Sequence, residues 1–214
     1  MHKILIIDDH DIVRFALQTL VNTSPTCTVV ETQASLTSGL ASIARLQPDL
    51  VVCDMSLGDS KGLNTMKAVV KAQNPRPVLI LSMHDEMIYA EQALALGVMG
   101  YLMKERAQEY LLQAVEKLLG GNIWVSPQVN VYLLNSLMKR KSKPSALGPS
   151  SQMAQLSQRE LEVLEKIGAG KTTKEIAFDL DLSPRTVDIH RANIKKKLGL
   201  KSGAEVLAFA LVKT

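Results

Sequence analysis

The chain has 214 residues, of which 46% are apolar, and it carries a formal net charge of +4. This length favours one or two domains with a substantial hydrophobic core, and no apolar run approaches the ~20 residues that a membrane span needs. Residues 1–138 hold 10 basic and 13 acidic side chains and residues 151–214 hold 11 and 8, so the C-terminal part suits a polyanionic partner.

The first 120 residues alternate between short apolar strands and amphipathic helices. Five such βα units with short connections predict a doubly wound parallel sheet of five strands. In the first helix, Ile12, Phe15, Ala16 and Leu20 share one apolar face. The expected strands cover residues 3–7, 28–31, 50–53, 78–81 and 101–103, and the expected helices cover residues 12–21, 36–46, 63–73, 87–96 and 108–119.

A segment rich in Ser, Pro, Lys and Gly, residues 138–152, separates this part from the rest of the chain. An apolar stretch, residues 129–138, precedes it and predicts a short helix. We therefore expect a first domain at residues 1–121, a linker with a short helix at residues 122–152, and a second domain at residues 153–214.

The second domain is expected to be all-α, with four helices. Ser157 and Thr172 each stand three residues before a glutamate, the capping-box pattern that begins a helix. Ser183 and Pro184 begin a longer helix that extends to Leu198. A short helix, a three-residue turn and a longer helix are typical of a helix-turn-helix motif.

Polar side chains follow four of the five expected strands. Asp8 and Asp9 follow the first strand, Asp54 the third, Ser82 the fourth and Lys104 the fifth. Because the carboxyl ends of parallel strands meet at one edge, where open α/β sheets bind ligands, we expect these side chains to lie close together. Carboxylates suit a hard cation such as Mg²⁺, and Asp54 could then act as a nucleophile toward phosphorus. Unrelated surface caps and ion pairs are the alternative.

The longest helix of the second domain is expected to read DNA in the major groove. Val187, Ile194 and Leu198 share a face that should pack inward. An ordinary solvated helix is the alternative. The opposite stripe, suited to base edges, holds Arg185, Asp188, Ile189, Ala192 and Lys196, and the residues around it that suit phosphates are Lys174, Thr186, His190, Arg191 and Lys195.

Both sets of motifs resemble one known family. DDHD at residues 8–11, Asp54 with Gly62, LSMHDE at residues 81–86 and GYLMKE at residues 100–105 resemble the receiver domain of bacterial response regulators. Residues 156–200 resemble the LuxR-type helix-turn-helix. Together they resemble the NarL/FixJ family of two-component response regulators. The resemblance implies an α/β fold with a flavodoxin-like or CheY-like receiver, followed by a small helical DNA-binding domain.

The resemblance also implies partners and roles. A sensor histidine kinase would phosphorylate Asp54, and the chain would then form a homodimer, bind promoter DNA and meet RNA polymerase. It would be a transcription factor without enzymatic activity beyond slow autodephosphorylation. Asp9, Asp54 and the Ser56 carbonyl would ligate Mg²⁺, with Asp8 acting through water. The switch residues would be Ser82, Lys104 and the rotating aromatic Tyr101, for which a plain core role is the alternative.

The chain departs from the family pattern at a few positions. Gly58 stands where many receivers have Pro, and Glu105 where many have a cis-Pro, so we expect looser loops. Asp181 replaces a Gly in the turn of the helix-turn-helix, and Asp tolerates left-handed φ better than most residues. Phe178 occupies a position that is usually polar in the family.

Three other classes of protein are alternatives to this family. A Mg²⁺-dependent phosphatase would need a second carboxylate two residues after its nucleophile, where this chain has Ser56. A dinucleotide-binding module would need a Gly-rich turn after the first strand. The third is a DNA-binding regulator controlled without phosphate.

The cysteines and the N-terminus bear on the location of the protein. Cys27 and Cys53 lack metal-ligand spacing and are expected to be core thiols. The N-terminus does not have the pattern of a signal peptide, so we expect a cytoplasmic protein.

Overall fold

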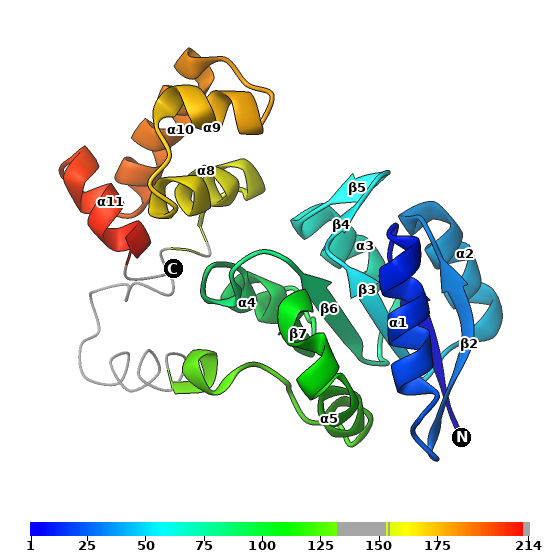
Figure 1. Ribbon diagram of the computed structural model, residues 1–214. Coiled ribbons are helices and arrows are strands. Elements are labelled where there is room, and N and C mark those ends of the chain that lie inside the picture. Colours follow the sequence, from blue (N-terminus) through cyan, green and yellow to red (C-terminus); the bar gives the residue numbers. More distant parts are fainter. Residues whose placement is uncertain (132–152, 154, 212–214) are drawn as a thin grey trace. The chain divides into compact units, whose positions relative to one another are not determined.

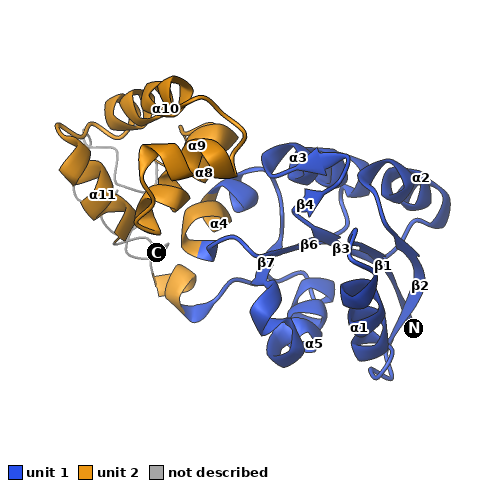
Figure 2. Cartoon of the chain, turned by 45° about the horizontal axis from the view of Figure 1, so that its top comes forward, with its two compact units in different colours: residues 1–86, 92–127 blue, residues 87–91, 128–214 orange. Residues whose placement is uncertain are grey.

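The computed structural model describes residues 1–131, 153 and 155–211 of the chain. These residues form two compact units (Figures 1 and 2). The first unit holds residues 1–86 and 92–127, and the second holds residues 87–91 and 128–214. Within the described residues, every helix is too short or too polar to cross a membrane.

The first unit is built on the predicted five-stranded parallel sheet, with strand order β2-β1-β3-β6-β7. This confirms the predicted fold class. The strands are β1 (His2–Ile7), β2 (Cys27–Gln33), β3 (Leu50–Asp54), β6 (Val78–Ser82) and β7 (Gly100–Met103). The helices between these strands and after the last one are α1 (Asp11–Val21), α2 (Leu36–Leu46), α3 (Leu63–Gln73), α4 (Glu86–Ala95) and α5 (Ala107–Leu119), with a short 3₁₀ turn, η1 (Lys104–Arg106), before α5. Residues 87–91 of α4 are the part grouped with the second unit.

Helices cover both faces of the sheet. Contacts join α1 to α5 on one face and α2 to α3 on the other (Figure 2). Along β1, Ile4 and Ile6 belong to the core that α1 and α5 cover, whereas Ile7 points to α2, where a Cβ on Gly39 would overlap its side chain. Because the sheet is covered on both sides, β3 is buried along its whole length and reads as a continuous apolar run.

The apolar face predicted for α1 is not the side that packs on the sheet, and of its four residues Leu20 alone packs partly buried against the core. Ile12 is 85% exposed and Phe15 is 72% exposed, and Ala16 is exposed as well. Leu17 and Val21 are buried against the sheet instead. The helix carries apolar residues on two sides, so its periodicity does not decide which side packs. A hydrogen bond from Arg14 Nη1 to the Asp8 carbonyl, at 2.7 Å, joins the helix to the end of β1.

The segment after α5 joins the edge of the sheet. The Tyr101 N–H donates to the Trp124 carbonyl, and the Trp124 N–H donates to the Met99 carbonyl, both at 3.0 Å. The Ser126 N–H donates to Glu86 Oε1 at 2.7 Å. Residues 127–131 are helical and coincide with the start of the predicted linker helix. The rest of that helix and the predicted linker, residues 138–152, lie outside the described residues.

Residues 155–211 form the four predicted helices: α8 (Gln158–Gly168), α9 (Thr173–Asp179), α10 (Pro184–Lys197) and α11 (Gly203–Leu211). Both predicted capping boxes are present, at Ser157 and Thr172. Ser183 caps α10, and Asp181 in the preceding turn has φ 52°, as expected for a position that is often Gly. Val187, Ile194 and Leu198 are buried, as predicted.

An ion pair between the buried Glu160 and the exposed Lys197 joins α8 to the end of α10. Glu160 accepts hydrogen bonds from the Ser157 N–H at 2.7 Å and from Lys197 Nζ at 2.6 Å. Burial acts to raise the pKa of Glu160, but the bonds from Lys197 and Ser157 outweigh it and lower the pKa. The carboxylate therefore stabilises the domain at neutral pH, and this stabilisation is lost as pH falls through the lowered pKa.

We expect Glu160→Gln to destabilise the second domain by about 1.5–3 kcal/mol at neutral pH, because a hydrogen-bonded buried charge is lost. Hydrogen exchange at the amides of α8 and α10 in the full chain measures this effect separately from the sheet. Glu162→Gln is the control, since its pair with Arg159 is more exposed and should be worth less than ~1 kcal/mol. Equal protection in wild type and Glu160→Gln would contradict the prediction.

Candidate functional site

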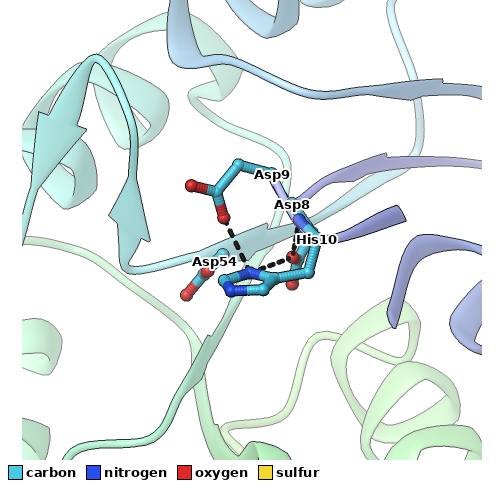
Figure 3. A group of neighbouring side chains, drawn as sticks. All are labelled: Asp8, Asp9, His10 and Asp54. Atoms are coloured by element: carbon cyan, nitrogen blue, oxygen red, sulfur yellow. Dashed lines mark hydrogen bonds and ion pairs between the residues drawn. The ribbon is translucent and has the colours of Figure 1, made fainter. Parts of the chain in front are cut away.

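The predicted carboxylates meet at the C-terminal edge of the sheet (Figure 3). Asp54 ends β3, and Asp8 and Asp9 directly follow the neighbouring strand β1. Asp8 and Asp54 are almost completely buried, at 0% and 3% exposure, while Asp9 is exposed. Burying two carboxylates this close together is costly unless a cation accompanies them.

Lys104 supplies part of that positive charge. Its Nζ lies 2.7 Å from Asp8 Oδ2 and 2.8 Å from Asp54 Oδ2. Burial raises the pKa of Asp54, and the hydrogen bond from Lys104 offsets only part of this effect. Burial also acts to lower the pKa of Lys104, but its bonds to Asp54 and Asp8 outweigh it and raise the pKa. The raised pKa of Asp54 thus reflects its burial, and the raised pKa of Lys104 reflects its two carboxylate partners.

The donor set fits a divalent cation. Ligand atoms of Asp8, Asp9, His10 and Asp54 all lie within 4.8 Å of one another. Lys104 pairs with Asp8 and Asp54, and Asp9 lies in the same cluster, so three carboxylates and one ammonium leave a formal charge of −2 without counting His10. Oxygen donors with this charge suit Mg²⁺, which binds through one or two carboxylates and keeps several waters.

Sequence reasoning missed the contacts of His10. Its Nδ1 lies 2.8 Å from Asp9 Oδ1 and 3.3 Å from Asp8 Oδ1 (Figure 3). The backbone N–H of His10 also donates to Asp8 Oδ1 at 2.9 Å. The position of the His10 ring depends on how the chain turns from β1 into α1. The sequence pattern of a histidine after two aspartates does not predict that turn.

The other predicted residues of this site lie around Asp54. The Ser56 N–H donates to Asp54 Oδ1 at 3.1 Å. Ser82 is buried at the end of β6, where its hydroxyl accepts from the His84 N–H at 2.9 Å. Tyr101 is completely buried, and its hydroxyl donates to the His84 carbonyl at 3.1 Å. Ser82 and Tyr101 therefore bond the same residue, His84, from neighbouring strands.

The predicted DNA-reading stripe of α10 is exposed. Arg185, Asp188 and Ala192 are exposed, and Ile189 is 54% exposed although it is apolar. The predicted phosphate-contacting residues divide into two groups. Those that are exposed are Lys174 and Lys195, and those that are partly covered are Thr186, His190 and Arg191. Lys196, the last residue of the base-reading stripe, is exposed as well.

The partly covered residues have structural roles within the domain. The Thr186 N–H donates to the Ser183 side chain at the start of α10. Arg191 Nη1 donates to Thr173 Oγ1 at 3.3 Å and so joins α10 to α9. His190 Nδ1 is buried without a hydrogen-bond partner among the described residues, so this side of the ring packs within the domain. Phe178, by contrast, is 88% exposed on α9.

Comparison with models of protein families identifies both domains. A family model described as the response regulator receiver domain matches residues 4–116, and one described as bacterial regulatory proteins of the luxR family matches residues 154–210. The chain is a response regulator. It combines a receiver domain with a LuxR-type DNA-binding domain, as the sequence motifs indicated.

Curated relatives match the response regulator over almost its whole length. The oxygen regulatory protein NreC of Staphylococcus carnosus is 33% identical over 213 residues, which cover 99% of this chain and 97% of that protein. The transcriptional regulatory protein YdfI of Bacillus subtilis is 30% identical and covers 100% of this chain and 97% of its own. These relatives are regulatory proteins, so the phosphatase and dinucleotide-binding alternatives no longer stand.

Solved structures show the same fold. RcsB from Salmonella enterica serovar Typhimurium, bound to promoter rprA in the presence of phosphomimetic BeF₃⁻, matches with a TM-score of 0.60 and 22% identity over 99% of both chains. A two-component response regulator RcsB–DNA complex also matches with a TM-score of 0.60 and 22% identity, over 100% of this chain and 98% of that one.

Proposed function

We propose that this response regulator is phosphorylated on Asp54 by a sensor histidine kinase, then forms a homodimer and binds promoter DNA to regulate transcription. The observation that carries the proposal is the convergence of Asp8, Asp9, Asp54 and Lys104 in one pocket of a chain that also holds a helix-turn-helix. The domain limits that we propose are 1–121 for the receiver, 122–152 for the linker and 153–214 for the DNA-binding domain.

Asp54 would be the nucleophile. One of its oxygens forms a bond to phosphorus while the bond between phosphorus and the imidazole nitrogen of the kinase breaks. Lys104 lies within 2.8 Å of Asp54 and would balance charge on the transferred group, to which Ser82 would donate a hydrogen bond. Tyr101 would couple Ser82 to the segment that leads into α4, because both bond His84.

Mg²⁺ would be held by Asp9, Asp54 and the Ser56 carbonyl, with Asp8 acting through water. When bound, the ion would neutralise the negative charge that phosphate adds to the pocket. We expect Mg²⁺ to stabilise the receiver by about 2.7 kcal/mol when present at 100 times its dissociation constant. Thermal melting in Mg²⁺ and in chelator measures this difference.

The matched pair of variants for this test is Asp9→Asn and Asp11→Asn. Asp11 lies in the same turn, but it is exposed and pairs with Arg14. Asp9→Asn should lose most of the stabilisation by Mg²⁺, whereas Asp11→Asn should keep it. Stabilisation of Asp9→Asn equal to that of wild type would remove Asp9 from the proposed ligand set.

The DNA-binding side of the proposal rests on exposed groups of α10 and α11. Ile189 and the exposed lysines of α10 are available for bases and phosphates. On α11, Leu207 and Leu211 are 39% and 56% exposed and offer an apolar contact to a second copy, while Val206 is buried. We place the protein in the cytoplasm, where a kinase, promoter DNA and RNA polymerase are accessible to it.

Phosphorylation should promote dimerisation and tighten promoter binding, and this tests the proposed function. Lys104→Ala should still accept phosphate on Asp54 but fail to dimerise, because it lacks the ammonium group that would bind the phosphoryl group. The coupling lost should be about 1–3 kcal/mol. Sedimentation and DNA binding at matched phosphorylation levels measure it, with Lys117→Ala on α5 as the control. If phosphodonor changes neither assembly nor DNA affinity in wild type, the proposed switch is wrong.

A further inference from the structure

The loop after the proposed acceptor is a small hairpin, although Gly58 in place of proline led us to expect a looser loop. Strands β4 (Ser56–Leu57) and β5 (Ser60–Lys61) pair antiparallel between β3 and α3. The hairpin is closed at its base, where the Gly62 N–H donates to the Met55 carbonyl at 2.9 Å. Ser56 therefore lies in a paired strand two residues after Asp54.

The turn of this hairpin is bonded to α2 through Asp59. One carboxylate oxygen accepts from the Leu36 N–H at 2.9 Å, and the other accepts from the N–H and the hydroxyl of Thr37 at 2.9 and 2.8 Å. Both N–H groups belong to the first turn of α2, where helix amides lack partners of their own. The bonds from Thr37 and Leu36 lower the pKa of Asp59, so its carboxylate stays charged at neutral pH.

The same hairpin reaches the acidic pocket at two places, its first residue and its turn. At its start, the Ser56 N–H donates to Asp54 Oδ1 at 3.1 Å. At its turn, a Cβ on Gly58 would lie 3.9 Å from Asp9 Oδ2. Asp59 follows Gly58 directly, so its three bonds to α2 fix the part of the hairpin that passes Asp9.

We propose that Asp59 is a positioning residue for the phosphorylation site. By bonding the turn of the hairpin to α2, it sets the place of the Ser56 carbonyl relative to Asp9 and Asp54. The inference rests on the proposed function, which assigns that carbonyl to Mg²⁺. Asp59 is neither a ligand nor a reacting group, and it acts through Ser56. Partners that orient a metal ligand in this way are typically worth about 10–100-fold in metal affinity.

Mg²⁺ titrations of the full-length protein test this role. Asp59→Ala should bind Mg²⁺ about tenfold more weakly than wild type. Its phosphorylation by acetyl phosphate should be slow at low Mg²⁺ and should approach the wild-type rate when Mg²⁺ saturates. Asp59→Asn keeps a carbonyl oxygen as acceptor and should recover part of the affinity. Asp49→Ala is the control, because it removes a carboxylate that accepts the Lys3 N–H at 2.7 Å at the other end of β3.

If Asp59 acted only through its negative charge near the ion, the variants would give a different result. It would weaken the Ala and Asn variants equally, and the effect would fade at high salt, where exposed charges are screened. That result, or Mg²⁺ affinity of Asp59→Ala equal to wild type, would overturn the inference and leave the proposed function intact. A wild type that binds no Mg²⁺ would overturn the proposed metal site, and the inference with it. Circular dichroism at the assay temperature verifies that each variant is folded.

Discussion

Asp54→Asn is expected to abolish labelling of the response regulator by a small phosphodonor in the presence of Mg²⁺. Wild type should gain a single phosphoryl group that is stable in acid and labile in base, as an acyl phosphate is. The reason is geometric, since Asp54 Oδ2 lies 2.8 Å from Lys104 Nζ in a pocket that Asp8 and Asp9 share. Intact-mass analysis measures the labelling directly.

Loss of labelling in this variant should not come from unfolding. Burial raises the pKa of Asp54 above its unfolded value, so the ionised carboxylate opposes folding at neutral pH. Asp54→Asn should therefore melt at the same temperature as wild type or higher. Asp49→Asn, at the other end of β3, should be labelled normally. Equal labelling of Asp54→Asn and wild type would show that another residue accepts the phosphoryl group.

The raised pKa of Asp54 belongs to the pocket without a bound cation. In metal-free protein, the Asp54 carboxyl group should therefore take up its proton at a higher pH than the ordinary pKa of 3.8 would give. Following the Asp54 carboxyl carbon by NMR during a pH titration in chelator measures this, and protonation at or below the ordinary pKa would contradict it.

The carboxylate pocket could be predicted because parallel topology determines which residues meet. Once strands alternate with helices, their C-terminal ends must share an edge. Asp8, Asp54 and Lys104 therefore had to lie near one another, although 46 and 50 residues separate them in sequence. Helix starts were predictable for a similar reason, because a capping box such as Ser157 with Glu160 is local.

The features that were missed depend on packing between distant segments. Which apolar side of α1 is buried depends on the exit from β1, not on helical periodicity, and Phe15 is exposed as a result. Asp59 bonds α2 across 22 and 23 residues of sequence, and a lone aspartate next to Gly58 gives no sign of it. The bond of Arg191 to Thr173 depends on the angle between α9 and α10, and its predicted phosphate contact stays a prediction.

Ile189→Ala is expected to change which DNA sequence the response regulator prefers. Ile189 is apolar yet 54% exposed on α10, between the exposed Asp188 and Ala192, and such a side chain suits the methyl group of thymine. The loss should be about 1–3 kcal/mol at one base pair. Affinity for scrambled DNA should stay unchanged, because non-specific binding depends on phosphate contacts.

Lys195→Ala is the matched variant, since it changes an exposed charge on the same helix. It should weaken specific and scrambled DNA alike and lower the slope of log affinity against log salt by about one unit. Titrations of both variants on both DNAs at several salt concentrations separate base reading from phosphate attraction. If Ile189→Ala weakened both DNAs equally and kept their ratio, α10 would not be the reading helix.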